Sequence, residues 1–274
     1  MERLIVRTAG LFEPVPHATR TAFRSRDHEE VQTNIGRMFC EHSMRLVNPR
    51  STLDTSVRRF DCRGLSMSDM AYGADVLIDA GCFGDFYLMQ IPLSGKAWVS
   101  TGGTQHPCLP GTGTVQNPED PVEMYWRADC RKLVLRYDRA TFERFVEFYS
   151  GRSLRTALRL APRIDFSMAS GAVFQRQLLD ILDILNVAGR DDDTVPQLLQ
   201  AHIENCLMSS LLLLQPNEQT DAFRQADMQA VPQAVRRVRE FLHAHAHEPV
   251  DAAMLGEVAA VPLRTLHYQF KRSL

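Results

Sequence analysis

The chain has 274 residues, 45% of them hydrophobic and 23% charged, which suits one large or two modest globular domains. Its formal net charge at pH 7 is only -2, so no overall positive field attracts nucleic acid and any DNA-binding site must be local. No apolar run approaches the roughly 20 residues of a membrane-spanning helix, and the first residues lack the apolar stretch of a secretory signal, so we expect a cytoplasmic protein without membrane contact.

The first predicted element is a short helix in the segment Phe23–Phe39. Asp27 is placed to cap its N-terminus, and Glu30 follows three residues later, as in a capping box. Apolar residues then recur at helical spacing: Val31, Ile35 and Met38. Together these signals predict the helix.

Between Arg45 and Tyr137, short runs of β-forming residues alternate with turn residues about every ten positions. The predicted strands are 53–62, 64–73, 74–79, 85–93, 96–100, 104–109, 113–117, 121–126 and 130–138. The pairs Gly102-Gly103 and Pro110-Gly111 suit tight turns. Because a chain this rich in strands must cover its strand edges, we expect it to close into a β-barrel, up-and-down or jelly-roll, whose interior holds a small ligand.

After Tyr137 the apolar spacing becomes helical. We predict a helix over 138–150 with Gly151 as its C-cap, then an antiparallel pair of longer helices, Met168–Val187 and Val195–Leu214. The last helix carries more apolar surface than one neighbouring helix needs, including Leu199, Ile203, Leu207 and Leu211. Burial within the subunit and a dimer seam both explain this surface.

Composition also suggests domain boundaries. We assign residues 1–150 to the barrel with flanking helices, 151–215 to the helical pair, 216–230 to a polar linker and 231–274 to a small all-α domain. In this last domain His243, His245 and His247 lack acidic or thiol partners at a metal-ligand spacing. A solvated helix end is therefore favoured over a metal site.

The C-terminal segment, PVDAAMLGEVAAVPLRTLHYQFKRSL, predicts two helices joined by a tight turn. The first spans Ala252–Ala259, and Pro262 suits the first turn of the second. Leu266 and Phe270 lie four residues apart and are expected to face the first helix. The opposite side carries side chains able to contact base edges and phosphates: Arg264, His267, Tyr268 and Lys271.

This segment resembles the first helix-turn-helix of the arabinose-regulator (AraC/XylS) family of transcription regulators, which typically reads Leu-Ala-x-x-Ala-Gly-Val-Ser-x-Arg-x-Leu-x-Arg-x-Phe. The matching residues are Leu255, Ala259, Val261, Arg264, Leu266 and Phe270. The departures are Ala260 for the turn glycine, Pro262 for the capping serine and Tyr268 for a residue that is commonly basic. The resemblance implies that Arg264, His267 and Tyr268 face DNA bases and that Lys271 and Arg272 lie nearer phosphates.

The DNA-binding domain of that family holds two such helix-turn-helices, whereas this sequence ends at Leu274, just after the first. If the protein is no longer than this, we expect weak DNA binding, because base and phosphate contacts are halved. A DNA-incompetent sensor that dimerises with full-length partners is the alternative.

The strand region resembles the sensor domain of the benzoate-responsive XylS branch of the same family, from GLSMSDMAYG to CRKLVLRYDR. The resemblance implies an α+β chain: a cupin-like effector-binding β-barrel with helices, a helical dimerisation segment and a partial all-α helix-turn-helix domain. It also implies a regulator, an activator by analogy, whose partners are promoter DNA, a small effector such as an aromatic acid, a second copy of the chain and RNA polymerase.

Ligand-binding candidates are strand residues able to stack on or pair with an aromatic acid: Arg45, Tyr87, Gln90, Trp98, His106 and Tyr125. Alternation along 85–93 places Tyr87, Met89 and Ile91 on one face and Leu88 and Gln90 on the other, without saying which face is internal. Core filling is the ordinary role of aromatic strand residues, and it stays open as the alternative.

An enzyme is the main rival class. Cupin-type barrels with a catalytic metal need clustered His and Glu side chains, but His106 is the only histidine within Arg45–Tyr137. The sequence holds neither a glycine-rich phosphate loop nor a Gly-x-Ser-x-Gly elbow, and its six cysteines include no Cys-x-x-Cys pair. We therefore expect no catalytic activity, no cofactor and no metal.

Overall fold

A computed structural model describes residues 20–150, 153–154, 156–188, 195–217, 235, 237–238, 241–242, 245 and 250–273. The chain divides into two compact units: Met1–Glu143 with Thr156–Glu218, and Arg144–Arg155 with Gln219–Leu274. Several sequence predictions lie outside the described residues, namely the Gly151 cap, most of the 216–230 linker, and His243 and His247.

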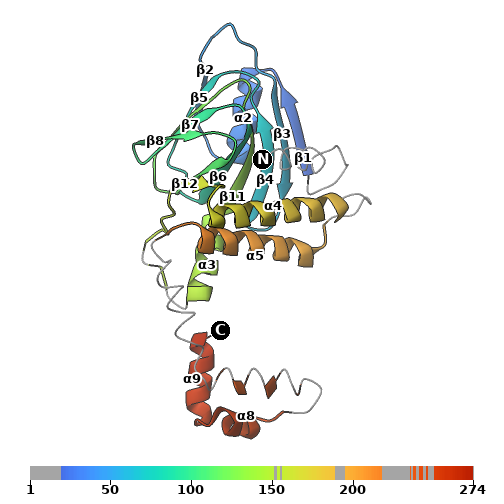
Figure 1. The fold of residues 1–274 in the computed structure, drawn as a ribbon, viewed down its shortest axis with the longest axis vertical. Coiled ribbons are helices and arrows are strands. Elements are labelled where there is room, and N and C mark those ends of the chain that lie inside the picture. The colour runs from blue at the N-terminus through green and yellow to red at the C-terminus, as the bar shows by residue number, and fades with distance from the viewer. Residues whose placement is uncertain are drawn as a thin grey trace. The chain divides into compact units, whose positions relative to one another are not determined.

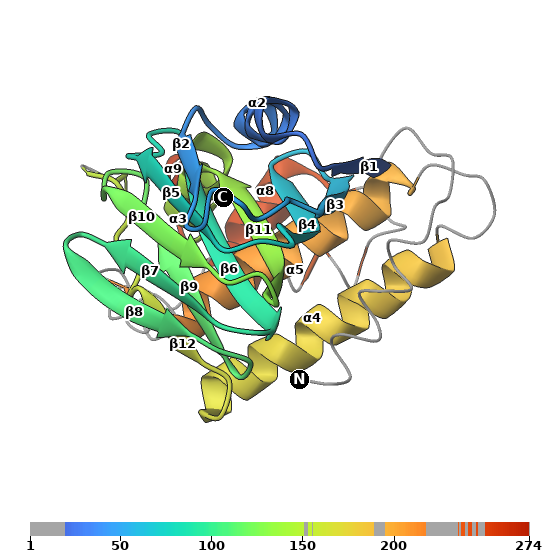
Figure 2. The same ribbon diagram turned by 90° about the horizontal axis from the view of Figure 1, so that it is seen from above.

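The first unit contains two antiparallel sheets, shown in Figures 1 and 2. The larger sheet has the strand order β1 (Arg20–Ser25), β3 (Thr55–Asp61), β4 (Leu65–Ala71), β11 (Arg131–Asp138), β6 (Phe86–Ser94), β9 (Thr112–Gln116) and β12 (Arg163–Asp165). The smaller sheet has the order β2 (Ser43–Leu46), β5 (Val76–Gly81), β10 (Val122–Trp126), β7 (Ala97–Thr101) and β8 (Thr104–Cys108).

The two sheets do not close into a barrel, so that prediction was wrong. The chain leaves β8 through the Pro110-Gly111 turn and enters β9, which pairs with β6 in the other sheet. Among the described strands, β8 pairs only with β7 and β1 only with β3. The two sheets therefore remain separate, as in a sandwich of the jelly-roll kind. The nine predicted strands are confirmed as β3 to β11, whereas β1, β2 and β12 were not predicted.

Helix α2 (His28–Met38) is capped as predicted, because the Asp27 carboxylate accepts a hydrogen bond from the Glu30 backbone N–H at 2.8 Å. Val31 and Ile35 are buried among residues of both sheets. The preceding residues Phe23–Ser25 belong to strand β1 rather than to the helix. The helix therefore begins at His28 and covers part of the sandwich core.

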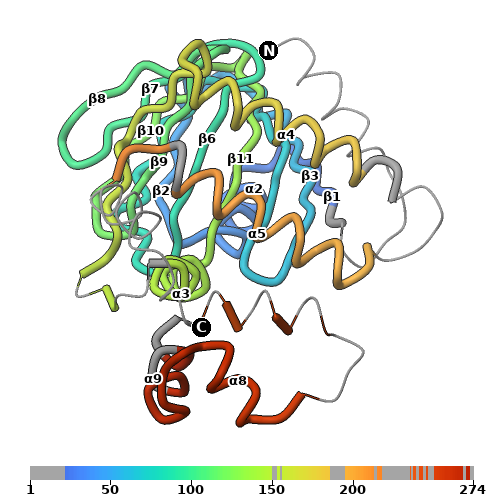
Figure 3. The backbone as a smooth tube through the Cα atoms, turned by 60° about the horizontal axis from the view of Figure 1, so that its bottom comes forward, coloured from blue at the N-terminus to red at the C-terminus, as the bar shows by residue number. Residues whose placement is uncertain are grey.

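The other face of the larger sheet carries α4 (Ala169–Ala188) and α5 (Gln197–Leu214), which lie side by side (Figure 3). Ile203, Leu207 and Leu211 are buried inside the subunit, and Leu199 is half-buried. The structure thus favours burial over the dimer seam for these residues, because a surface already covered within one subunit is not free for a second. None of the helices within the described ranges combines the length and hydropathy needed to cross a bilayer.

Helix α3 (Arg139–Ser150) follows β11, and α8 (Ala252–Ala259) and α9 (Leu263–Ser273) lie in the second unit. The Asp251 side chain caps α8 by accepting from the Met254 backbone N–H at 2.8 Å. A small core joins the two helices and two residues before them: Val235, Val238, Ala259 and Leu266, with Phe270 packed against it. The predicted inward face of the second helix is therefore confirmed.

The turn between α8 and α9 places Ala260 in the left-handed region, with φ 53°, which disfavours a residue with a Cβ atom. We predict that Ala260→Gly stabilises this pair of helices by about 1 kcal/mol, because glycine adopts this conformation without strain. Hydrogen exchange of the α8 and α9 amides measures the effect. Ala259→Gly changes the neighbouring residue, which is buried in the helix, and serves as the control. It should destabilise the pair of helices by about 1 kcal/mol. If both substitutions stabilise the helices, or neither does, Ala260 is not strained.

Candidate functional site

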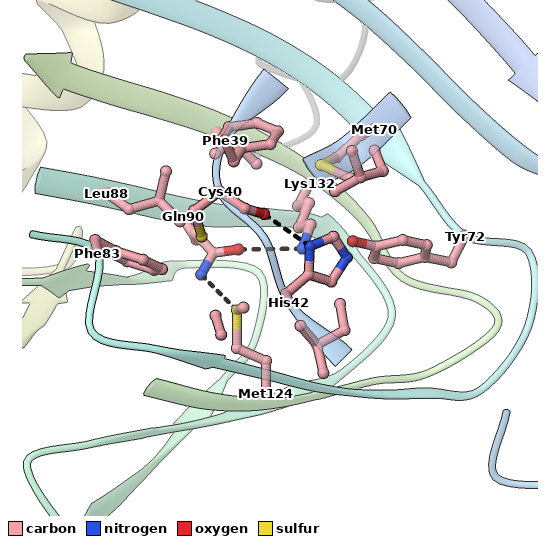
Figure 4. A pocket seen from close by; sticks show the side chains of 14 residues that line it. Phe39, Cys40, His42, Met70, Tyr72, Phe83, Leu88, Gln90, Met124 and Lys132 are labelled. Carbon is pink, nitrogen blue, oxygen red and sulfur yellow. Dashed lines mark hydrogen bonds between the residues drawn. The ribbon is translucent and has the colours of Figure 1, made fainter. Parts of the chain in front are cut away.

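A small cavity lies between the two sheets of the first unit, and Ile35 of α2 is part of its wall. Figure 4 shows its lining side chains. Its lining is mostly apolar and comes from both sheets and from α2 and the residues after it: Ile35, Phe39, Cys40, His42, Met70, Tyr72, Ile78, Ala80, Phe83, Leu88, Gln90, Met124, Lys132 and Val134. Its free volume is about 40 Å³, room for a few water molecules rather than for an aromatic ring. A few polar groups in an apolar wall are typical of a small-molecule site.

Lys132 is the only ammonium group among these lining residues, and only 3% of it is exposed. It extends from β11 in the larger sheet, and its Nζ lies 3.3 Å from the ring centroid of Trp126 on β10 in the smaller sheet. The ring centroid of Tyr72 lies 5.2 Å away. The amine is therefore held between the sheets against two aromatic faces, which attract a cation.

The charge of Lys132 has no counter-ion within the described ranges, since no Asp or Glu side chain there forms an ion pair with it. Burial disfavours the charged form and lowers the pKa of this amine to about 7. The amine is therefore about half protonated near neutral pH.

Gln90 supplies a hydrogen-bond acceptor for this amine. Its Oε1 accepts from Lys132 Nζ at 3.1 Å, while its Nε2 donates to Gln116 Oε1 at 3.1 Å. Gln90 and Gln116 are both fully buried. This chain of amides fixes the position of the amine without neutralising its charge.

His42 contributes a second polar group to the cavity wall. Its Nδ1 lies 2.9 Å from the Cys40 backbone oxygen, and because a carbonyl only accepts, Nδ1 carries the hydrogen. The other ring nitrogen, Nε2, is buried and has no hydrogen-bond partner among the described residues. In the neutral ring Nε2 is a hydrogen-bond acceptor. The cavity wall therefore presents a cationic donor, the Lys132 ammonium group, and an acceptor that lacks a donor, His42 Nε2.

Of the predicted ligand-binding residues, only Gln90 lines this cavity. Leu88 lines the cavity too, so the face of β6 that carries Leu88 and Gln90 is the internal one. Tyr87 points to the opposite face of the larger sheet, where its hydroxyl donates a hydrogen bond to Glu143 Oε1 at 2.9 Å. Trp98 and Tyr125 stack on each other at 5.4 Å on the outer face of the smaller sheet. Arg45 is exposed on β2, and His106 is half-buried with an unpartnered Nε2, but neither lines the cavity.

Sequence reasoning missed Lys132 and His42. Lys132 alternates with Leu133 along β11, but the pattern gives no sign of which face is internal. His42 lies three residues before the region searched for metal ligands. Within the described ranges, no three His, Cys, Asp or Glu side chains are grouped so as to hold a metal ion.

The predicted DNA-binding residues lie on α9. Arg264, His267 and Lys271 are exposed, on the side away from buried Leu266. The side chains of Tyr268 and Arg272 lie outside the described set. Three of the five candidates are therefore available to a partner.

Curated proteins that the chain resembles are bacterial transcription regulators. XylDLEGF operon transcriptional activator 1 of Pseudomonas putida is 21% identical over 210 residues, which cover 76% of this chain and 62% of that protein. The probable thc operon regulatory protein of Rhodococcus erythropolis is 20% identical over 263 residues, covering 94% and 77%. The chain thus spans less than two thirds of the first relative.

Among solved structures, the AraC-like transcriptional activator CuxR matches with a TM-score of 0.51 and 10% identity, covering 92% of this chain and 88% of that one, which shows a shared fold. The family description of the AraC-binding-like domain matches residues 32–213, which include every residue that lines the cavity. The chain therefore belongs to the AraC-binding-like domain family.

Proposed function

We propose that this chain is a transcription regulator, an activator like the XylDLEGF operon relative, that senses a small molecule between its two sheets. The observation that carries the proposal is the apolar cavity of an AraC-binding-like domain whose wall holds a buried amine without a counter-ion among the described residues. A buried charge without a counter-ion costs stability, so a role in ligand binding explains its presence. The relatives are regulators rather than enzymes, which supports a non-catalytic role.

The proposed effector is a small organic acid, an aromatic one by the resemblance of the strand region to the benzoate-responsive branch. The aromatic and thioether side chains around the cavity suit such a ring. Since the free volume is about 40 Å³, binding requires the wall to open. The wall includes Met70 and Met124, whose unbranched side chains adapt to changes in packing more readily than branched ones. Such a movement links ligand binding to a change in the domain.

The proposed output is promoter DNA read by α9, with a second copy of the chain and RNA polymerase as further partners. Arg264 is exposed near the start of that helix, where a recognition helix contacts base edges. We predict that Arg264→Ala lowers discrimination between the operator and altered sites by about 1–3 kcal/mol at the contacted base. Fluorescence anisotropy with labelled promoter fragments, each changed at one base pair, measures this loss.

Lys271→Ala is the matched control for this prediction, because it removes one exposed positive charge from the same helix. A phosphate contact carries no sequence information, so this change should weaken binding to every fragment equally and reduce the salt dependence by about one ion. An unchanged base preference after Arg264→Ala would contradict the assignment of α9 as the reading helix.

The function as a whole is tested by titrating promoter DNA with the chain in the presence and absence of benzoate-like acids. We expect the acid to change the DNA affinity or the oligomeric state of the chain. Ligand binding without any DNA binding, together with co-purification of a full-length homologue, would favour a sensor that modulates partner proteins.

A further inference from the structure

We propose that the cavity takes a hydroxycarboxylic acid, with Lys132 Nζ pairing with the carboxylate and His42 Nε2 accepting a hydrogen bond from the hydroxyl group. This inference rests on the proposed sensing function and names the ligand chemistry of the same cavity. Binding of the carboxylate then takes up a proton from solution, so the affinity should depend on pH.

The carboxylate follows from the surroundings of Lys132. Its present contacts are the neutral Gln90 Oε1 at 3.1 Å and the ring of Trp126 at 3.3 Å, which stabilise a cation less than an anion does. In a buried site an ammonium with a fixed anion is far better stabilised than one without. A carboxylate entering the cavity therefore supplies the counter-ion that the described residues withhold.

Among the residues that the structure describes, none places an anion against this amine. The titratable groups nearest the amine are Tyr72 after β4, Cys108 on β8 and Cys130 before β11, with Cys40 and His42 farther along the wall. Burial raises the pKa of Tyr72 and of the three thiols, that of Cys130 to about 11, so these groups are neutral at pH 7. Asp69 on β4 pairs in register with Leu133, so its carboxylate lies on the face of the sheet opposite Lys132, where it pairs with Arg131.

The hydroxyl group follows from His42. The Cys40 carbonyl holds the hydrogen on Nδ1, which leaves a lone pair on Nε2. A buried acceptor without a donor costs free energy, and a second carboxylate oxygen does not satisfy it because that oxygen also only accepts. A ligand hydroxyl donates one hydrogen bond and fits this vacancy.

The proton balance gives the direction of the pH dependence. Above pH 7 the Lys132 amine of the empty site is mostly neutral. When the carboxylate binds, the amine takes one proton from solution and becomes an ammonium group paired with the carboxylate. No covalent bond to the ligand forms or breaks. The carboxylate raises the pKa of the amine by stabilising its charged form. Affinity is therefore nearly constant below about pH 6.5 and falls about tenfold for each pH unit above about 7.5.

The test is calorimetric titration of the whole 274-residue chain at pH 6.5, 7.5 and 8.5. The probes are benzoate, its three monohydroxy derivatives and the corresponding neutral amides. At pH 6.5 we expect at least one hydroxybenzoate to bind about tenfold more tightly than benzoate, the effect of one added hydrogen bond, and each acid to bind more tightly than its amide.

Two substitutions assign the contacts. Lys132→Met keeps the length of the side chain but removes its charge. It should lower the affinity for the acids by about 30-fold or more, the effect of losing a buried charged partner. It should also abolish the pH dependence of binding. His42→Phe keeps a ring at this position and should remove only the extra affinity of the hydroxybenzoate over benzoate. Lys96→Met, at an exposed lysine, is the control and should change neither property.

Each outcome decides the inference. Tight, proton-linked binding of a hydroxybenzoate that depends on both residues supports it. Equal binding of acids and amides, unaffected by Lys132→Met, overturns it but leaves a neutral effector and hence the sensing function in place. Failure of every probe to bind at millimolar concentration also overturns it, and the promoter titration then judges the sensing function separately.

Discussion

Replacing Trp126 by alanine lowers the free energy of unfolding of the sheet unit by about 4 kcal/mol, because a fully buried aromatic side chain leaves a void that the neighbouring strands cannot fill. Trp126 lies on β10 within the core between the sheets, and its ring also faces Lys132 Nζ. The substitution therefore removes both packing and the aromatic face that holds the amine. Urea denaturation followed by far-ultraviolet circular dichroism measures the loss.

Trp98→Ala is the matched control, since the sequence contains only these two tryptophans. Trp98 lies on the neighbouring strand β7, where it is half-buried and stacks on Tyr125 at the outer face of the same sheet. Its loss should cost about 1 kcal/mol, the usual contribution of one aromatic pair. Equal losses from the two substitutions would contradict the placement of Trp126 in the core.

Asp69→Ala should destabilise the same unit by about 3 kcal/mol, because it leaves a guanidinium group without its partner in a largely buried position. The Asp69 and Arg131 side chains form a bidentate pair across β4 and β11, with Arg131 Nε donating to Asp69 Oδ1 at 2.7 Å. Their side chains are 5% and 30% exposed. Because Lys132 follows Arg131 directly, this pair also holds β11 at the cavity.

Asp54→Ala tests whether burial, rather than the ion pair itself, sets this effect. Asp54 forms the same kind of bidentate pair with Arg24, whose Nη2 lies 2.9 Å from Oδ2, but these side chains are 42% and 69% exposed. Water and salt screen such a pair, so little change in stability is expected. Equal destabilisation in 1 M salt by both substitutions would contradict the role given to burial.

The strands were predictable because alternation and turn residues are local signals. Runs such as 130–138 and 85–93 combine β-forming residues with clear limits, and they became β11 and β6. How the strands divide between two sheets depends on pairing between distant residues, such as Met89 with Val115, which no single run encodes. The closed barrel was therefore predicted where a sandwich formed.

The site was less predictable for the same reason. Gln90 was found because it shares an alternating run with Leu88, whereas Trp98 and Tyr125 were chosen for their chemistry although they face outward. The role of Lys132 arises only when Trp126, from the other sheet, lies against its amine. A charged residue inside a strand is predicted to be exposed, because charged side chains are seldom buried. Its burial becomes evident only in the tertiary structure.

The central claim, that a small acid binds between the two sheets, is tested most directly by methyl nuclear magnetic resonance. Titrating the methyl-labelled chain with the tightest-binding hydroxybenzoate should shift the signals of Ile78, Leu88 and Val134, which line the cavity. Lys132→Met should reduce these shifts at the same ligand concentration. Shifts confined to Leu211 and Ile164, which line a separate pocket beside α4 and α5, would contradict the account.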